Sequence, residues 1–198
     1  CLLSRGLGDV YKRQIMGIIP KRTGTIRFDG RDMMPVPLHR TAHHGIGFVP
    51  EERGIFASLT VEENLTLPPV VGKGGMTLDE IYDLFPNLHE RRASGGTKLS
   101  GGEQQMLAIA RMLRSGVRLL LLDEPTEGLA PVIVERIGEI LIELKKRGLT
   151  VLLVEQNFRF AARVADRFYL MDHGTVVDSF ATRDLAHHQQ RLNEVLGV

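Results

Sequence analysis

Two uninterrupted apolar runs constrain the fold of this chain more than any other feature. "RLLLLDEP" (118–125) and "LTVLLVEQ" (149–156) are each long enough for one strand and lack any alternation of polar and apolar residues. Such runs are typical of strands buried on both faces of a parallel sheet. Between them, isoleucines recur at helical spacing over 131–147. Strand, helix and strand in this order predict an α/β fold.

Shorter elements are predicted on both sides of this unit. Gly, Pro and Asp bound short strands within 24–30 and 45–50, and 168–180 reads as a closing hairpin that turns at His173-Gly174. The middle of the chain, about 55–115, is more helical.

The composition is that of one globular domain with a core. The chain has 198 residues, 43% of them hydrophobic, and no apolar run approaches the length of about 20 residues that spans a bilayer. Lys+Arg 25 against Asp+Glu 24 leaves a net charge of +1, which gives no general attraction to nucleic acid. Cys1 is the single cysteine, so an internal disulfide is excluded.

"KLSGGEQQMLAIARML" (98–113) is the most specific stretch of the sequence. Ser100 and Glu103 have the spacing of a capping box at the start of an amphipathic helix. That pattern does not explain Gly101 and Gly102, which lower helix propensity in the first turn. Two glycines at a helix N-terminus leave backbone N–H groups open to a phosphate. The stretch therefore predicts a phosphate-binding helix start.

Polar residues end the two apolar runs. Asp123 and Glu124 follow the first run, and Gln156 follows the second. Open α/β sheets bind ligands at the carboxyl ends of their strands, so these side chains are candidate site residues. The amide of Gln156 can donate a hydrogen bond to a phosphate but cannot ionise.

These stretches together resemble the ATPases of the ABC type. "LSGGEQQ" looks like their signature motif, "LLLLDE" like their Walker B strand and "VLLVEQN" like their switch segment, where most members carry His. "TEGLAP" occupies the place of the D-loop, with Ala130 where Asp is usual. "GIGFVPEERGIFASLTVEENL" resembles the Q-loop region, with Glu51 where Gln is usual. The resemblance implies a P-loop NTPase-like ABC ATPase fold with a mainly parallel sheet core and a helical signature subdomain at about 55–115.

The resemblance also implies roles for individual residues. Glu124 would polarise the attacking water, Gln156 would contact the γ-phosphate, and Asp123 would help to hold Mg²⁺, through water. ATP and Mg²⁺ are the implied cofactors. The implied nucleotide-binding residues are Ser100, Gly101, Gly102, Glu103 and Glu51.

Within the family, the chain looks most like the smaller ATP-binding subunits of branched-chain amino-acid importers. "VPEERGIF", "DEPTEGLAP" and "LLVEQN" carry this likeness, which extends to importers of urea and short-chain amides. It implies transmembrane permease subunits and a second ATPase subunit, identical or not, as partners. A periplasmic solute-binding protein would take part indirectly, and the chain would lie at the cytoplasmic face of the inner membrane.

Two other classes of function fit fewer of the residues. An ATPase head from DNA repair or chromosome organisation would need heptads for a coiled-coil arm, and the sequence has none of sufficient length. A nucleotide-independent interaction fragment is the other alternative, because the sequence has no intact phosphate loop.

The first residues, "CLLSRGLGDVYKRQ", depart from the family. Measured against the phosphate-loop pattern G-x-x-x-x-G-K-[ST], they have Tyr11 in place of the second glycine and Arg13 in place of the hydroxyl. We interpret 1–14 as a non-native leader joined to a partial ABC ATPase domain over 15–198. Such a chain is expected not to bind ATP normally by itself.

Two histidine pairs are interpreted as solvated surface rather than metal ligands. His43-His44 and His187-His188 have no Cys or acidic companions at ligand spacing, and a metal site needs three or four ligands.

Overall fold

A parallel sheet forms the centre of the molecule, which we describe from a computed structural model over residues 1–4, 15–19 and 22–196. Within these residues six strands form this sheet in the order β4-β5-β6-β1-β7-β8, and neighbours are parallel except for β7 and β8. The predicted α/β fold with a mainly parallel sheet is confirmed. The strands are β4 (Ile46–Val49), β5 (Leu119–Asp123), β6 (Thr150–Glu155), β1 (Leu2–Ser4), β7 (Arg167–Asp172) and β8 (Thr175–Ala181).

The apolar run of β5 is unbroken because both faces of this strand are covered. Leu120 and Leu122 pack into the main core with helix α7 (Pro131–Lys146), whereas Leu121 packs on the other face with Met16 and Met33. A polar side chain on either face would lose its water without gaining a partner.

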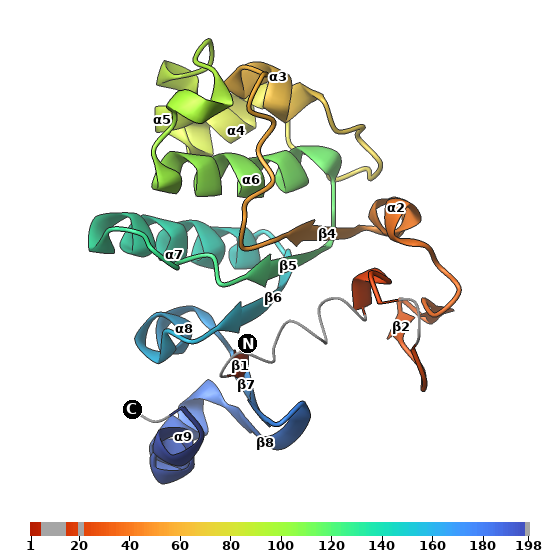
Figure 1. Ribbon diagram of the computed structural model, residues 1–198, viewed down its shortest axis with the longest axis vertical. Helices are drawn as coiled ribbons and strands as arrows, with labels where there is room; N and C mark the ends of the chain where they lie inside the picture. Colours follow the sequence, from red (N-terminus) through yellow and green to blue (C-terminus); the bar gives the residue numbers. More distant parts are fainter. Residues whose placement is uncertain (5–14, 20–21, 197–198) are drawn as a thin grey trace.

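Helices enclose the sheet on three sides (Figure 1). α3 to α6 lie at the β4 end, α7, α8 and α9 lie along one side, and the short β2–β3 hairpin lies on the other side with α2. The stretch expected to be helical, about 55–115, contains α3 to α6. The remaining elements are β2 (Arg27–Phe28), β3 (Arg31–Asp32), α2 (Leu38–Thr41), η1 (Ala42–His44), α3 (Val61–Thr66), α4 (Leu78–Leu84), α5 (Pro86–Glu90), η2 (Gly96–Lys98), α6 (Gly101–Ser115), α8 (Phe158–Val164), η3 (Thr182–His188) and α9 (Gln189–Leu196).

Capping boxes start α3, α4 and α6. In α6 the predicted box is confirmed: the Ser100 N–H donates to Glu103 Oε2 over 2.7 Å, and the Glu103 N–H donates to Ser100 Oγ over 3.3 Å. The same reciprocal bonds join Thr60 to Glu63 and lower the pKa of the Glu63 carboxyl. Each box gives otherwise unpaired first-turn donors a partner and fixes where its helix begins.

The start of the chain lies in the middle of the sheet. Leu2 pairs with Val154 of β6 and Tyr169 of β7, and the Leu3 side chain is 0% exposed. The leader predicted for 1–14 thus includes residues that form a central strand, while 5–14 lie outside the described residues. The origin of this segment stays a prediction.

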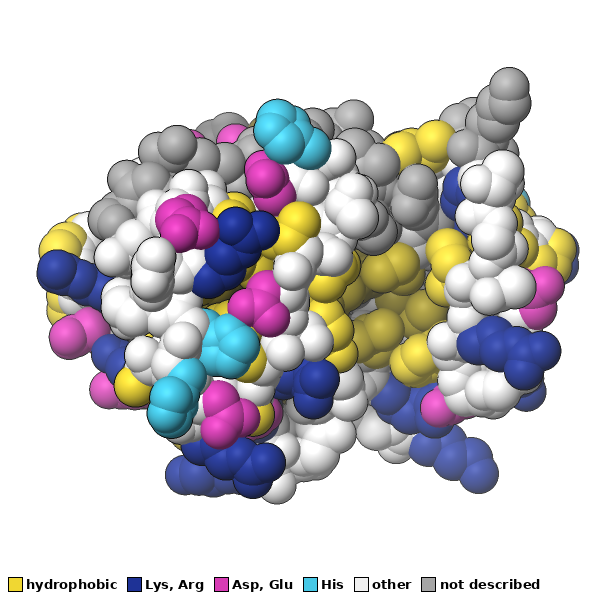
Figure 2. Space-filling model, turned by 90° about the horizontal axis from the view of Figure 1, so that it is seen from below, with side chains coloured by type: hydrophobic (Ala, Val, Ile, Leu, Met, Phe, Trp, Pro, Cys, Tyr) yellow, Lys and Arg dark blue, Asp and Glu magenta, His cyan; other side chains and the backbone are white. Residues whose placement is uncertain are grey.

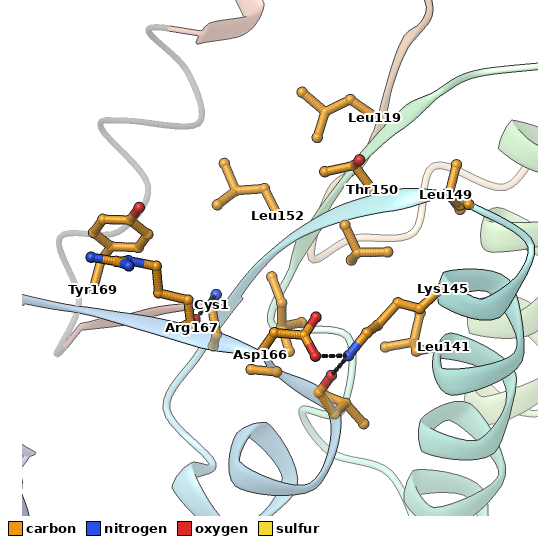
Figure 3. Close-up of a pocket in the computed structure, with 15 residues that line it drawn as sticks. Cys1, Leu119, Leu141, Lys145, Leu149, Thr150, Leu152, Asp166, Arg167 and Tyr169 are labelled. Carbon is orange, nitrogen blue, oxygen red and sulfur yellow. Dashed lines mark hydrogen bonds and ion pairs between the residues drawn. The ribbon is translucent and has the colours of Figure 1, made fainter. Parts of the chain in front are cut away.

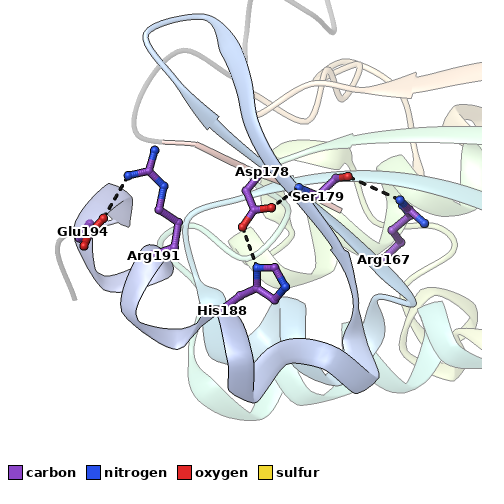
Figure 4. Close-up of polar contacts among 6 residues, drawn as sticks. All are labelled: Arg167, Asp178, Ser179, His188, Arg191 and Glu194. Carbon is purple, nitrogen blue, oxygen red and sulfur yellow. Dashed lines mark hydrogen bonds and ion pairs between the residues drawn. The ribbon is translucent and has the colours of Figure 1, made fainter.

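His188 connects the C-terminal elements to β8 (Figure 4). His188 Nδ1 lies 2.7 Å from Asp178 Oδ2, and the His188 ring stacks on Phe180 with centroids 4.1 Å apart. The interpretation of His188 as solvated surface is therefore wrong, because folding brings a carboxylate and an aromatic ring from β8 against it. The predicted hairpin turn between β7 and β8 is confirmed, with positive φ at His173 and Gly174.

We expect His188→Ala to lower the free energy of unfolding by about 1–2 kcal/mol, because it removes a charged hydrogen bond and a ring contact. Urea unfolding of the variant measures this difference. His187→Ala is the matched control, since His187 is exposed on the same 3-10 helix. Equal losses in the two variants would contradict the assignment of the contact to His188.

Candidate functional site

Two predicted catalytic residues meet at the carboxyl ends of β5 and β6. Asp123 is paired with Val154 in the parallel register, so Glu124 and Gln156 leave neighbouring strands at the same edge. Gln156 Nε2 donates to Glu124 Oε1 over 2.8 Å. Folding therefore joins a carboxylate and a carboxamide that are 32 positions apart in the sequence.

Glu124 has a strained backbone. Its φ is +42°, in the left-handed region that non-glycine residues rarely adopt, and its N–H donates to the Val154 carbonyl over 2.9 Å. Such strain costs on the order of 1–3 kcal/mol and concentrates at functional sites, where it aims a side chain that the regular strand would point elsewhere.

Further carboxylates surround Glu124. The pKa of Glu127 is raised, first by its side-chain hydrogen bond with Glu124 and then by the negative charges of Glu124 and Glu51. Glu51, predicted from a distant part of the sequence, thus lies close enough to this edge to act on it. Glu127 was not predicted as a site residue, although it lies in the "TEGLAP" stretch that resembles the D-loop.

Glu155 is a second residue that the sequence analysis missed, and it fixes the geometry of the edge. Its side chain is 2% exposed. One carboxylate oxygen accepts from Thr126 Oγ1 over 2.6 Å, and the other accepts from the backbone N–H groups of Gln156 and Asn157 over 3.0 and 2.9 Å. Glu155 therefore ties the turn after β5 to the turn after β6. A polar residue at the end of an unbroken apolar run is the signal that could have found it.

Asp123 has the chemistry of a protein ligand for Mg²⁺. Its side chain is buried at the end of β5, directly before Glu124. Mg²⁺ bound together with a nucleotide takes one or two carboxylates from the protein and its other ligands from water and phosphate. Among residues 1–4, 15–19 and 22–196 no group of three or more His, Cys, Asp or Glu side chains could hold a metal ion alone. The donor set thus suits a cation that arrives with phosphate.

The predicted phosphate-binding turn lies at the start of α6, and its two glycines have different surroundings. A Cβ on Gly102 would stand 2.7 Å from Ile133 Cγ2, so glycine here allows α6 to pack against α7. The nearest atoms to a Cβ on Gly101 would be those of the Arg53 guanidinium, at 3.4 Å. Packing alone explains Gly102, and only Gly101 still depends on the phosphate argument. Glu103 is engaged by the capping box and lies 3.7 Å from Arg91 Nε.

Two arginines that were not predicted join the Glu51 loop to α6. Arg111 Nη1 donates to the Gly54 carbonyl over 2.6 Å, and its guanidinium lies 4.7 Å from the centre of the Phe56 ring. Arg53 has a φ of +65° and places its guanidinium against Gly101. The loop that carries Glu51 and the turn that carries Ser100 are therefore parts of one packed unit.

A hollow with a hydrophobic floor opens on the lower face of the molecule (Figure 2). One cavity, of about 600 Å³, lies at the amino ends of β5, β6 and β7, opposite the carboxylate edge (Figure 3). Lys145 and Asp166 there neutralise each other over 2.8 Å, and Lys145 Nζ also donates to the Val164 carbonyl. The remaining lining is mostly apolar. This cavity contains none of the predicted site residues.

We expect Glu155 to contribute a loss of stability as pH rises above about 4.5, because burial raises the pKa of its carboxyl above the ordinary 4.5. An acid with a raised pKa in the fold ionises more readily in the unfolded chain. The free energy of unfolding therefore falls as pH rises through the folded pKa. Glu155→Gln should flatten this fall in urea unfolding across the acidic range. The exposed Glu135→Gln control should keep the wild-type slope, and an unchanged slope in Glu155→Gln would contradict the assignment.

We expect Arg111→Met to lower the free energy of unfolding by about 2 kcal/mol, because it removes a charged, partly buried hydrogen bond to the Gly54 carbonyl. Arg114→Met, on the same helix, removes only a longer bond of 3.4 Å to the Met76 carbonyl and should cost less. Urea unfolding of both variants measures the difference. A larger loss in Arg114→Met would exclude the proposed role of Arg111 in holding the loop.

Comparisons with known proteins agree with this geometry. A family model described as ABC transporter matches residues 12–127. The branched-chain amino acid transport ATP-binding protein BraG of Pseudomonas aeruginosa is 43% identical over 164 residues, covering 78% of this chain and 68% of BraG. The probable branched-chain amino acid transport protein LivF of Archaeoglobus fulgidus is 34% identical, covering 94% and 80%. The lipopolysaccharide export protein LptB of Haemophilus influenzae is 33% identical, covering 92% and 78%.

Solved structures show the same fold. A nucleotide-free ATP-binding cassette superposes with a TM-score of 0.82 at 19% identity, over 100% of this chain and 86% of that one. A dimeric cassette bound to ADP and phosphate gives 0.79 at 24% identity, over 92% and 84%. Across the described ranges of this chain, no helix has both the length and the apolarity to cross a bilayer. The chain belongs to the ABC transporter family, as an ATP-hydrolysing subunit with the ABC ATPase fold.

Proposed function

We propose that this chain is the ATP-binding subunit of an importer for branched-chain amino acids. The observation that carries its part in hydrolysis is the 2.8 Å hydrogen bond from Gln156 to Glu124 at the carboxyl edge of the sheet. It supports Glu124 as the group that polarises the attacking water and Gln156 as the amide that orients it. The same amide has a second N–H for a phosphate oxygen.

Asp123 and Glu124 are the groups that would face Mg²⁺ and the attacking water. Bound Mg²⁺ supplies charge neutralisation for the phosphates. The chain's own part is to hold Glu124 in its strained conformation, through the Glu124 N–H bond to Val154 and the Glu155 network below it.

The solute is proposed from the relatives. BraG and LivF are both named for branched-chain amino acid transport, and BraG has a higher identity than the LptB proteins, at 43% against 33–34%. "DEPTEGLAP" and "LLVEQN" support the same choice. A urea or short-chain amide importer is the alternative. The proposed partners are permease subunits and a second ATPase, with a periplasmic binding protein acting indirectly, at the cytoplasmic face of the inner membrane.

The signature turn would act on a nucleotide held by the second ATPase. Ser100 and Gly101 lie at the start of α6, which Arg53 joins to the Glu51 loop. Closing of the two subunits on ATP would convert binding free energy into movement of the permeases. We propose that the signature turn of this chain completes the ATP site of its partner.

Mixing the 198-residue chain with purified BraG tests this proposal. We expect association that requires MgATP, measured by size exclusion with light scattering, and labelled ATP retained by the associated mixture. Ser100→Arg should abolish the association, because a bulky cation would occupy the phosphate-facing turn. Ser58→Arg, at an exposed serine outside that turn, is the control.

Phosphate release by the mixture separates the proposed role of Ser100 at the partner's ATP site from the proposed role of Glu124 in hydrolysis. Ser100→Arg should lower it at least about 100-fold, because association is lost. Glu124→Gln should keep the association and lower phosphate release from the ATP held by this chain, since Glu124 acts on ATP held by its own subunit. Unchanged release in Glu124→Gln would contradict the proposed role of Glu124. Association independent of both ATP and Ser100 would overturn the proposed function.

A further inference from the structure

A second cavity, with a polar lining, lies at the end of β5 that is opposite the carboxylate edge. Its volume is about 360 Å³. It begins beside the residue that precedes β5, so the length of this strand, about 16 Å for five residues, separates it from Asp123. The residues that line it come from the β2–β3 hairpin, from η1 and from the start of β5: Phe28, Asp29, Arg31, His43, His44 and Arg118.

Arg118 is held in place by several independent contacts. Its guanidinium forms an ion pair with Asp29, lies 5.4 Å from the centre of the Phe28 ring, and has Nη2 3.5 Å from the His44 carbonyl. A Cβ at Gly45 would stand 3.1 Å from Arg118 Nε, so the glycine, at φ +87°, leaves room for this side chain. The cation is therefore oriented before any ligand arrives, which reduces the entropy lost on binding.

The backbone conformation of the hairpin turn sets the position of Asp29. This residue has a φ of +51° and precedes Gly30 at +75°, as in the two-residue turns that close tight hairpins. This turn holds its carboxylate against Arg118.

The cavity holds more donors than the protein itself uses. Two guanidiniums and two imidazoles face one carboxylate, which Arg118 already engages. Arg31 has as its polar contact the His44 Nδ1, at 3.5 Å, which must accept because arginine can only donate. The other ring nitrogen of His44 then carries a proton. Within the described part of the chain, His43 has no hydrogen-bond or ion-pair partner.

We propose that this cavity binds a phosphate group through Arg31, Arg118 and the two imidazoles of η1. Guanidinium groups match the oxygens of a phosphate in pairs, and imidazole N–H groups can satisfy the others. The volume suits a phosphate with a small substituent and lies near the lower end of the range for ligand pockets. The ligand is a soluble phosphate ester or the headgroup of an anionic phospholipid, and neither depends on the proposed transport function.

The test uses the full chain and two probes. Inorganic phosphate is titrated by calorimetry, and vesicles of phosphatidylcholine with or without phosphatidylglycerol are sedimented with the protein. We expect saturable binding of phosphate, of phosphatidylglycerol vesicles, or of both. R31Q/R118Q should lower that affinity at least about tenfold. Arg31→Gln alone, which leaves the Asp29–Arg118 pair intact, should show most of the loss if the double variant is destabilised.

R183Q/R191Q is the matched control. It removes the same charge from two exposed arginines that pair with Asp184 and Glu194 near the C-terminus. Binding that this control retains and R31Q/R118Q loses supports the site, and the probe that binds identifies its source. An equal loss in the control, retention of full binding in both double variants, or the absence of binding to either probe would overturn the proposal.

Discussion

The parallel register of β5 and β6 determines where every candidate catalytic group lies. Because Asp123 is level with Val154, the residues that follow the two strands meet at one edge, and Gln156 reaches Glu124. A shift of one residue would turn the side chains of a strand to the opposite faces and exchange the leucines that pack into the two cores. The same hydrophobic burial that stabilises the sheet therefore sets the geometry of the site.

Glu155 holds the turn after β5 and the turn after β6 together. A buried carboxylate is unfavourable unless hydrogen bonds replace its water, and here donors from both turns provide them. These hydrogen bonds hold the two turns in place, and burial raises the pKa of the Glu155 carboxyl. The strain at Glu124 persists for the same reason, since the surrounding contacts leave its backbone no relaxed alternative.

The helical region adds a second rigid unit to this edge. Arg111 of α6 binds the Gly54 carbonyl of the Glu51 loop, and Arg53 of that loop lies against Gly101 at the start of α6. Gly102 allows α6 to pack directly on α7. The signature turn, the Glu51 loop and α6 are thus packed together. At the other end of β5, the hairpin and η1 gather cations around a separate cavity, so the two ends of one strand carry opposite local charge.

The sequence by itself determined the elements that depend on local pattern: the buried strands, helix α7 from its proline onward, the capping box of Ser100 and the hairpin turn at His173-Gly174. It also determined the family, because the motifs are contiguous. Only the tertiary structure decided which distant side chains meet. Glu155 with Thr126, Arg111 with Gly54, His188 with Asp178 and Arg31 with His44 are joined across 29, 57, 10 and 13 positions. Periodicity reports which face of an element is buried, whereas the partner on that face depends on how whole elements pack.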